Sequence, residues 1–357
     1  MKPEEQKARY FTKELVAWHK TVNDRSLPWK NEKDPYRIWL SEILLQQTRA
    51  LQGLPYYLRF TEDYPNVKKL AQANEEEVYR LWQGLGYYNR CKNLLATAKY
   101  ISDELNGVFP DTYEGLLLLK GIGPYTAAAI ASFAYGSPHA VTDGNVYRVL
   151  ARYLGIETPY DTTEGKKLFA QNADRLLNKK DSGSYNQAIM DLGATVCTPA
   201  NPKCPECPVS KYCVALHEGL TELLPVRSKK TTVKNRYFHY LLLHTGDKLW
   251  IHKRTGKGIW ENLYEPLLIE NSEKLNAKAL LVHPEFAALR TVALPEYKGT
   301  VKQRLTHQLI ETHFFSIRYE NELDIASKDG KWVKITALKK YAFPKTVLSF
   351  LENNFYF

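Results

Sequence analysis

The sequence predicts a mostly helical part over residues 1–224, a linker over 225–236 and an α+β part over 237–357. Three observations support this division. The first part has apolar residues recurring at helical spacing, interrupted by short Gly, Pro and Asp segments. The proposed linker carries five positive charges, no acidic residue and no apolar period. After it, Tyr237–His244, a Thr-Gly-Asp-Lys turn and Leu249–Lys253 are typical of a β-hairpin.

The predicted elements follow in chain order. In the helical part, amphipathic runs lie near Glu4–Thr21, Pro35–Phe60, Asn89–Leu105, Pro124–Ala134, Asn145–Leu154 and Thr163–Leu177. In the second part, we expect another strand at His313–Tyr319 and helices around Glu273–Val282 and Thr336–Leu351.

Composition limits the class of protein. The chain has 357 residues, 44% of them hydrophobic, so it can bury a full core. No stretch approaches the roughly 18 apolar residues of a membrane helix, and the N-terminus lacks the order of a secretory signal. We therefore expect a cytoplasmic protein. The net charge of +10 favours a polyanionic partner, although ribosome-bound and merely basic proteins share this feature.

The run Trp39–Thr48 is apolar but carries one carboxylate, Glu42, in its middle. Apolar side chains cover most directions around this predicted helix, which is typical of a buried helix. An unpaired carboxylate there loses its water, so its pKa rises and it tends to hold a proton. The alternative is a helix-edge residue that reaches solvent or pairs with Arg37 or Arg49. The run alone does not separate the two.

The segment Leu116–Ala129 contains a tight Gly-x-Gly turn between two predicted helices. Pro124 fits the first position of the second helix, and Gly121 and Gly123 allow close approach to the backbone. Free N–H groups at the start of that helix make an anion site. We predict a helix-hairpin-helix element that contacts the DNA backbone without reading base sequence. The alternative is a plain turn between helices.

Asp143 lies directly before another predicted helix, which begins near Asn145. A short acidic residue at this position is an ordinary N-cap. Taken by itself, the segment favours this structural role over a catalytic one.

Four of the five cysteines, Cys197, Cys204, Cys207 and Cys213, fall in one short loop. Such clustering in a cytoplasmic chain indicates metal binding rather than disulfides. Tetrahedral zinc and a [4Fe–4S] cluster both accept four thiolates. The spacing lacks the two separated Cys-x2-Cys pairs common in zinc sites and favours the cluster, with zinc as the alternative. Cys91 stands apart and is expected to be a core thiol.

These motifs, in this order, resemble the helix-hairpin-helix superfamily of DNA glycosylases with an iron–sulfur loop, and within it the MutY-type adenine glycosylases. The most specific segments are Trp39–Thr48, Gly84–Arg90, Gly121–Tyr125, Val141–Asn145 and the four cysteines. The resemblance covers essentially the whole chain. It implies two helical subdomains with the iron–sulfur loop at 197–213, joined to a Nudix-like domain. It also implies a monomer with a [4Fe–4S] cluster that acts on double-stranded DNA containing A:8-oxoguanine or A:G mispairs.

The resemblance gives roles to four residues. Glu42 would protonate the purine, at N7 in the family's mechanism, because neutral adenine is a poor leaving group. Asp143 would stabilise or capture the oxocarbenium sugar, and Tyr125 and Asn145 would orient these carboxylates. The endonuclease III branch has a Schiff-base lysine where this chain has Tyr125. A monofunctional glycosylase is therefore implied, with Lys120 as a source of slow lyase activity at most.

Further residues match family positions that hold the DNA. By weaker analogy, the walls of the pocket for the flipped-out adenine are Arg25, Leu27, Trp29, Leu45 and Gln187. Two positions match residues that wedge into the gap that the flipped-out base leaves in the duplex: Gln47 and one of Tyr87 and Tyr88.

The second part resembles the Nudix-like domain that reads 8-oxoguanine, through Lys257–Pro266. It lacks the acidic helix of a working Nudix hydrolase, so we expect no nucleotide hydrolysis. The family's Phe-Ser-His reading loop is replaced by Leu305, Thr306 and His307. Thr306 keeps a hydroxyl for the N7–H of the lesion, whereas Leu305 lacks the aromatic ring. The alternative is that Thr306 and His307 are ordinary polar loop residues.

Other functions fit parts of the sequence. One is a mismatch glycosylase for thymine or uracil, or a bifunctional endonuclease III-like enzyme; a pyrimidine has no N7 to protonate. Another is a non-catalytic DNA-binding protein that keeps the hairpin and the cluster for structure. The presence of both Glu42 and Asp143 favours the adenine glycosylase.

Overall fold

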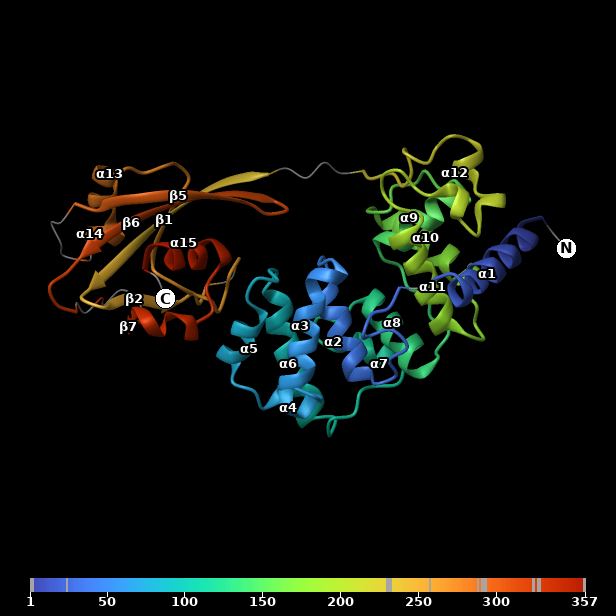
Figure 1. The fold of residues 1–357 in the computed structure, drawn as a ribbon, viewed down its shortest axis with the longest axis horizontal. Coiled ribbons are helices and arrows are strands. Elements are labelled where there is room, and N and C mark those ends of the chain that lie inside the picture. Colours follow the sequence, from blue (N-terminus) through green and yellow to red (C-terminus); the bar gives the residue numbers. More distant parts are fainter. Residues whose placement is uncertain are drawn as a thin grey trace. The chain divides into compact units, whose positions relative to one another are not determined.

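The structure, a computed structural model, describes residues 3–23, 25–228, 233–256, 258–287, 289, 294–322, 325 and 329–355. The chain forms two compact units. The first comprises Met1–Gln72 and Asn93–Lys229, and the second comprises Ala73–Lys92 and Lys230–Phe357. The first is helical and the second contains a sheet, which confirms the predicted fold class (Figure 1). No helix in the described part of the chain is long and apolar enough to cross a membrane.

The first unit is built from helices. Their bounds are α1 (Pro3–Thr21), α2 (Pro35–Leu45), α3 (Ala50–Asp63), α4 (Val67–Ala71), α6 (Asn89–Asp103, which begins in the second unit), α7 (Tyr113–Leu117), α8 (Pro124–Tyr135), α9 (Gly144–Leu154), α10 (Thr163–Leu176), α11 (Ser182–Thr195) and α12 (Val214–His217), with short 3-10 helices η1 (Cys204–Glu206) and η2 (Ser210–Tyr212).

The single run predicted at Pro35–Phe60 is wrong, because it forms two helices. The chain leaves α2 at Gln46 and enters α3 only at Ala50. Between them Gln47 has a φ of 56°, a left-handed conformation that few residues other than glycine adopt. The Gln46 side chain donates a hydrogen bond to Thr126 Oγ1 of α8 at 3.4 Å, so a tertiary contact accompanies the break.

Polar caps and glycines set the ends of the helices that carry the predicted site. The side chains of Asp34, Asp143 and Asp181 cap α2, α9 and α11 by accepting backbone N–H bonds. Helices α8 and α9 end at Gly136 and Gly155, both in the left-handed conformation.

Helix α11 packs against α1, α8 and α9 in the first unit. Phe11 and Leu15 of α1 and Leu192 of α11 are fully buried in this core. Gly193 permits the close approach of α11 to the start of α9, because a Cβ at this position would lie 2.6 Å from the Asn145 side chain. The core therefore holds the N-terminal end of α9 against α11.

The second unit contains a seven-stranded sheet with the order β3-β2-β1-β6-β5, in which β4 also pairs with β1 and β7 with β2. Its elements are α5 (Glu75–Trp82), β1 (Lys234–Thr245), β2 (Lys248–Lys253), β3 (Tyr264–Glu265), β4 (Leu267–Asn271), α13 (Ala277–Leu281), α14 (Pro284–Ala287), β5 (Glu296–Arg304), β6 (Gln308–Arg318), β7 (Gly330–Lys334), η3 (Ile335–Lys340) and α15 (Lys345–Phe355). β1 and β6 are parallel and the other pairs are antiparallel.

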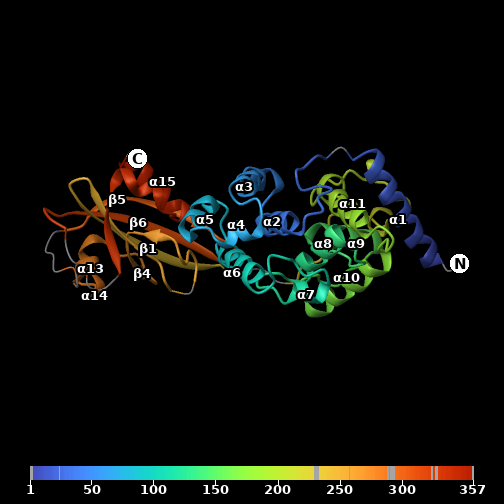
Figure 2. The ribbon, with the colours of Figure 1, turned by 90° about the horizontal axis from the view of Figure 1, so that it is seen from below.

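Helices cover both faces of this sheet (Figures 1 and 2). Phe315 of β6 packs in a core with Leu280 and Phe286, the buried residues of α13 and α14. The preceding Phe314 points to the opposite face, since successive side chains of a strand alternate. Its ring stacks on Phe350 of α15 with centroids 3.7 Å apart. The predicted hairpin and the strand near residue 313 are confirmed as β1–β2 and β6.

The segment Ala73–Lys92 belongs to the second unit, although the sequence places it in the first part. Glu76 accepts a hydrogen bond from Tyr264, and Asn262 donates to the Tyr79 hydroxyl at 2.9 Å. Lys92 forms an ion pair with Glu261 at 2.7 Å. Strand β1 begins inside the predicted linker, of which residues 229–232 lie outside the described residues.

Candidate active site

Glu42 lies on the buried side of α2 and is 8% exposed. Burial raises its pKa from 4.5 to about 7, and the nearby Asp143 carboxylate adds to the effect, while the Tyr125 hydroxyl opposes it through a hydrogen bond. Arg37, one of the cations that the sequence offered as a partner, pairs instead with Glu32 at 3.5 Å and Asp34 at 3.9 Å. Glu42 can therefore hold a proton at neutral pH.

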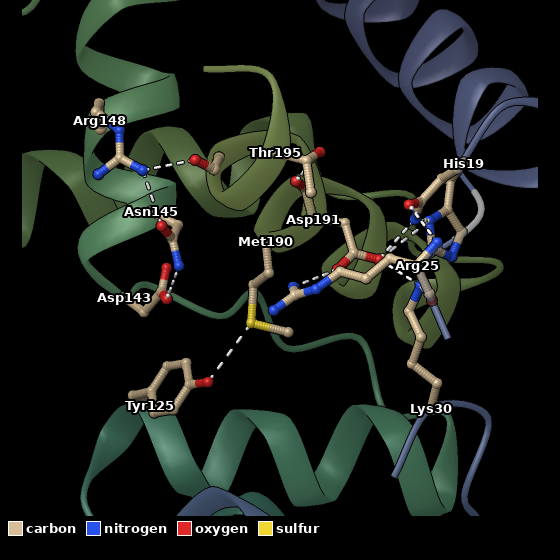
Figure 3. Close-up of polar contacts among 12 residues, drawn as sticks. His19, Arg25, Lys30, Tyr125, Asp143, Asn145, Arg148, Met190, Asp191 and Thr195 are labelled. Atoms are coloured by element: carbon tan, nitrogen blue, oxygen red, sulfur yellow. Dashed lines mark hydrogen bonds and ion pairs between the residues drawn. The ribbon is translucent and has the colours of Figure 1, made fainter. Parts of the chain in front are cut away.

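Tyr125 is the second residue of α8, and its hydroxyl forms a hydrogen bond with the Glu42 carboxyl group. The hydroxyl donates to the sulfur of Met190 on α11 at 3.5 Å (Figure 3). Burial and the carboxylates of Glu42 and Asp143 raise the pKa of Tyr125 well above 10. The phenol is therefore neutral and able to donate a hydrogen bond.

Asp143 caps α9 by accepting the Val146 N–H at 2.8 Å. Its other oxygen accepts a hydrogen bond from Asn145 Nδ2 at 2.9 Å, and Asn145 Oδ1 accepts one from Arg148 Nη2 at 2.8 Å (Figure 3). Burial raises the pKa of Asp143 above its ordinary value, and the hydrogen bonds from Val146 and Asn145 and the Arg148 charge only partly oppose this shift. The carboxylate is thus an N-cap and also part of a polar chain that ends at Arg148.

The hairpin between α7 and α8 has the predicted conformation. Gly121 has a φ of 81°, and a Cβ there would lie 2.8 Å from the Asn93 side chain. Gly123 is the N-cap of α8, where a Cβ would meet no atom within 4 Å. The exposed Lys120 precedes this turn, and its carbonyl accepts a hydrogen bond from Thr97 at 2.7 Å. The turn leaves the first N–H groups of α8 open for an anion.

Two of the five predicted pocket walls line a common cavity of about 290 Å³. They are Arg25 and Leu27, and the other lining residues are His19, Asn23, Ser26, Lys30 and Asn31. Trp29 packs edge-on against Tyr57 with ring centroids 5.2 Å apart. Leu45 ends α2 and Gln187 lies on α11. The described residues that line the cavity do not include Trp29, Leu45 or Gln187.

The two tyrosines proposed for the wedge differ in exposure. Tyr87 is 49% exposed and has a φ of 48°, whereas Tyr88 is 8% exposed. Gln47, the other wedge residue of the sequence prediction, is exposed in the first unit. Gln47, with a φ of 56°, shares the left-handed backbone of Tyr87. Residues other than glycine seldom adopt this conformation, and those that do are often found at functional sites.

The hairpin that joins β5 and β6 carries the predicted lesion-reading residues. Leu305 N–H donates to the Gln308 carbonyl at 2.7 Å, and Lys234 N–H donates to the His307 carbonyl at 3.0 Å. Thr306 and His307 are exposed at the tip. The hydroxyls of Thr306 and Tyr87, both in the second unit, share a hydrogen bond of 2.7 Å.

The four cysteines line one small pocket beside α9. Arg152 Nη1 donates to Cys197 Sγ at 3.4 Å, and the Cys213 thiol donates to the Arg152 carbonyl at 3.4 Å. In the part of the chain that the structure describes, no group of three or more His, Cys, Asp and Glu side chains is arranged to hold a metal ion. Cys91 is fully buried and apart from this loop, as predicted.

Three residues around the site escaped the sequence prediction: Arg148, Met190 and Asp191. Arg148 also donates to the carbonyls of Cys197 and Gly193, each at 2.7 Å. Asp191 is fully buried and accepts from Arg25 at 2.8 Å. Arginine and aspartate are seldom buried in a protein unless they are paired with other polar groups. The sequence does not show this burial, because it arises only when the helices pack together.

Comparisons with known proteins agree with this arrangement. Residues 40–173 match the model of the HhH-GPD superfamily base excision DNA repair protein, and residues 239–353 match the NUDIX domain. An adenine DNA glycosylase of Buchnera aphidicola subsp. Acyrthosiphon pisum is 34% identical over 71% of this chain and 73% of its own. The Homo sapiens adenine DNA glycosylase is 41% identical over 57% of this chain and 39% of its own.

Among solved structures, a thermostable thymine-DNA glycosylase is similar to this chain with a TM-score of 0.56 and 28% identity. It covers 61% of this chain and 100% of its own. The relative from Buchnera is matched over most of its length and at 34% identity. The chain belongs to the adenine DNA glycosylase family.

Proposed function

We propose that this protein is a monofunctional DNA glycosylase of base excision repair that removes adenine mispaired with 8-oxoguanine, and also with G. The observation that carries the proposal is Glu42, a buried carboxyl group with a pKa of about 7 next to Tyr125 and Asp143. An acid that is still protonated at neutral pH is the group that purine excision requires.

In the proposed reaction, the Glu42 proton moves to N7 of the flipped-out adenine. The bond from the sugar to N9 then breaks, and its electron pair stays with the base. The positive charge that develops on the sugar is stabilised by Asp143, which Asn145 and the Val146 N–H hold in place. Water adds to C1′ and its released proton restores the protonated Glu42, which leaves free adenine and an abasic site. Tyr125 provides no amine, so no Schiff base forms and the strand stays intact.

We infer that DNA is held by three features. The Gly121–Gly123 turn presents N–H groups at the start of α8 to a phosphate. Gln47 and Tyr87 are the wedge residues; the exposure of Tyr87 favours it over the buried Tyr88. The tip at Thr306 and His307 reads 8-oxoguanine, and its exposed hydroxyl and imidazole support this role.

We also propose that Cys197, Cys204, Cys207 and Cys213 bind a [4Fe–4S] cluster. The support is that the four thiols line one pocket, with the Arg152 guanidinium 3.4 Å from the Cys197 sulfur, although the described side chains are not arranged as ligands of a metal ion. When bound, the cluster supplies iron–thiolate bonds that close the loop. The chain itself then holds Lys203 and Lys211 on this loop, where they contact phosphates.

The test compares four duplexes under single-turnover conditions: A:8-oxoguanine, A:G, T:G and U:G, with alkali cleaving any abasic product. Excision of adenine alone, fastest opposite 8-oxoguanine, is the expected result. The likeness to a thymine-DNA glycosylase makes T:G the necessary competitor. Excision of thymine or uracil in preference to adenine would refute the proposal, and so would the absence of excision from all four duplexes.

A further inference from the structure

Asp191 is the centre of a polar cluster that the proposed chemistry does not use. It lies on α11, is 0% exposed, and accepts hydrogen bonds from three side chains of the segment between α1 and α2 (Figure 3). Asn23 Nδ2 and Lys30 Nζ lie 2.7 and 2.8 Å from Oδ2, and Arg25 Nη1 lies 2.8 Å from Oδ1. His19 Nδ1 lies 3.6 Å from Oδ2.

These bonds fix the loop from residue 23 to residue 30 at both ends. Lys30 Nζ also donates to the Arg25 carbonyl at 2.5 Å, and Arg25 N–H donates to Asn23 Oδ1 at 3.3 Å. Asn23 Nδ2 further contacts His19 Nδ1 at 2.9 Å. The described residues between α1 and α2, 22–23 and 25–34, form no helix or strand. The bonds to Asp191 therefore tie Asn23, Arg25 and Lys30 of the loop to α11.

The cluster adjoins both the cavity and the catalytic residues. Arg25, Lys30, Asn23 and His19 all line the 290 Å³ cavity. Asp191 follows Met190, whose sulfur accepts the Tyr125 hydroxyl bond, and it is four residues beyond Gln187, hence on the same face of α11. Figure 3 shows Met190 between Tyr125 and the Asp191 cluster.

The cluster around Asp191 has more hydrogen-bond donors than its single carboxylate accepts, so some N–H groups can serve a ligand. One carboxylate faces two cations, Arg25 and Lys30. Arg25 donates through Nη1, and its Nε and Nη2 groups donate to no other described residue. An adenine ring carries several nitrogen acceptors at its edges, so a wall of oriented N–H donors is complementary to it. Guanidinium donors select for acceptors only if the side chain is held in one orientation.

We propose that Asp191 is a positioning residue for base recognition: it holds Arg25 and Lys30 in the orientation that forms the donor wall of the adenine pocket. This inference rests on the proposed function and extends it to residues of α11 and the loop. Asp191 itself does not contact the base. It acts through Arg25, and the loss of Asp191 affects the flipped-out base more than the rest of the bound DNA.

The test uses Asp191→Asn in the full-length protein. The amide has the shape of the carboxylate, but in either orientation its NH₂ group faces a donor, either Arg25 or the Asn23 and Lys30 pair. Affinity is measured for two duplexes that differ only in the nucleotide opposite 8-oxoguanine. One carries the non-cleavable 2′-fluoro-2′-deoxyadenosine, and the other a tetrahydrofuran abasic analogue with no base.

We expect Asp191→Asn to weaken binding of the fluoroadenosine duplex by roughly tenfold or more, as for the loss of hydrogen bonds to a charged group. Binding of the abasic duplex should stay within about twofold, since its backbone contacts are unchanged. Arg25→Gln should give the same selective loss. The double variant should be little worse than either single one, because both changes remove one interaction.

Ser182→Ala is the matched control. Ser182 is buried on the same helix and bonds to the carbonyls of Gly136 and Ser137, away from the loop. It should not discriminate between the duplexes. An equal loss on both duplexes with Asp191→Asn, no loss on either, or additive effects in the double variant would each overturn the inference. Excision by the unaltered protein is measured first, so failure of the proposed function is seen separately.

Discussion

Glu42→Gln separates the chemistry of the buried acid from its packing. The amide has nearly the same shape as the carboxyl group but cannot donate a proton of comparable acidity to the purine. We expect the single-turnover rate of adenine excision to fall by at least ~10²–10⁴-fold, the usual contribution of a general acid. Binding of the substrate duplex should be largely retained, because Glu42 is buried in α2 and is not a phosphate contact.

The magnitude follows from the pKa. With a pKa of about 7, roughly half of Glu42 is protonated at pH 7, whereas a carboxyl group with the ordinary value of 4.5 would be about 0.3% protonated. Burial therefore raises the available acid by about two orders of magnitude. The rate should fall as the pH rises through 7, since the protonated form is lost.

The raised pKa of Glu42 also makes the free energy of unfolding depend on pH. Because the pKa of Glu42 is higher in the folded than in the unfolded protein, the unfolded state binds fewer protons between pH 4.5 and 7. The free energy of unfolding therefore decreases as the pH rises through this window. A pKa difference of this size corresponds to roughly 3 kcal/mol. Glu42→Gln, which is neutral throughout, should be more stable than the unaltered protein above pH 7, and the difference should shrink towards pH 4.5.

The assay pairs excision at pH 7 with denaturant unfolding at pH 5 and pH 8. Glu32→Gln is the control of opposite sign. Burial raises the pKa of Glu32, but the N–H groups of Asp34 and Lys33 and the Arg37 charge lower it more, so the net shift is downward. That variant should lose stability above pH 5 and keep its activity. Near-normal excision by Glu42→Gln, or a stability difference independent of pH, would refute the role given to Glu42.

Four further predictions test the rest of the site. Asp143→Asn should keep the N-cap, since Asn caps as well as Asp, and still lose excision by ~10²–10³-fold because the sugar cation loses its counter-charge; full activity would reduce Asp143 to a cap. The purified protein should be brown with about four irons and four sulfides per chain, and a colourless, zinc-loaded, fully active protein would contradict the cluster. Borohydride should trap no strong protein–DNA adduct during turnover, because Tyr125 offers no amine; efficient trapping would point to Lys120. Thr306→Ala should narrow the preference for A:8-oxoguanine over A:G by about two- to twelvefold, the loss of one neutral hydrogen bond, and His307→Ala should do so at least as much. An unchanged ratio of single-turnover rates at one stated salt concentration would remove the β5–β6 hairpin from lesion reading.

Point variants are better suited to the last test than truncation. Removing residues 230–357 would strip α5 of its contacts to Tyr264 and Asn262. An effect on selectivity could then arise from the exposed segment 73–92 rather than from the loss of a reading loop. The division of the chain, which the sequence alone does not show, therefore changes the experiment.

Local patterns in the sequence predicted the parts of the fold that local interactions determine. The Gly121–Gly123 turn, the cap at Asp143 and the β1–β2 hairpin depend on neighbouring residues, and each forms where it was expected. The break after Leu45 is accompanied by a hydrogen bond from Gln46 to Thr126, eighty residues away. An apolar pattern that continues through such a break cannot show it, because a helix and a bent pair of helices share the same period.

The three acidic residues of the site show why residue type alone does not assign a role. Glu42 is buried with a tyrosine hydroxyl and another acid as neighbours, so it tends to keep its proton. Burial also raises the pKa of Asp143, but its N–H donors from Val146 and Asn145 oppose that shift and favour the charged form, which suits the role proposed for it. Asp191 is more deeply buried than either, yet Arg25 and Lys30 pair with it, which suits a group that orients others. The cap of Asp143 is three residues away and visible in the sequence, whereas the partners of Asp191 are more than 160 residues away. Only packing α11 against the loop before α2 brings the third acid into the site.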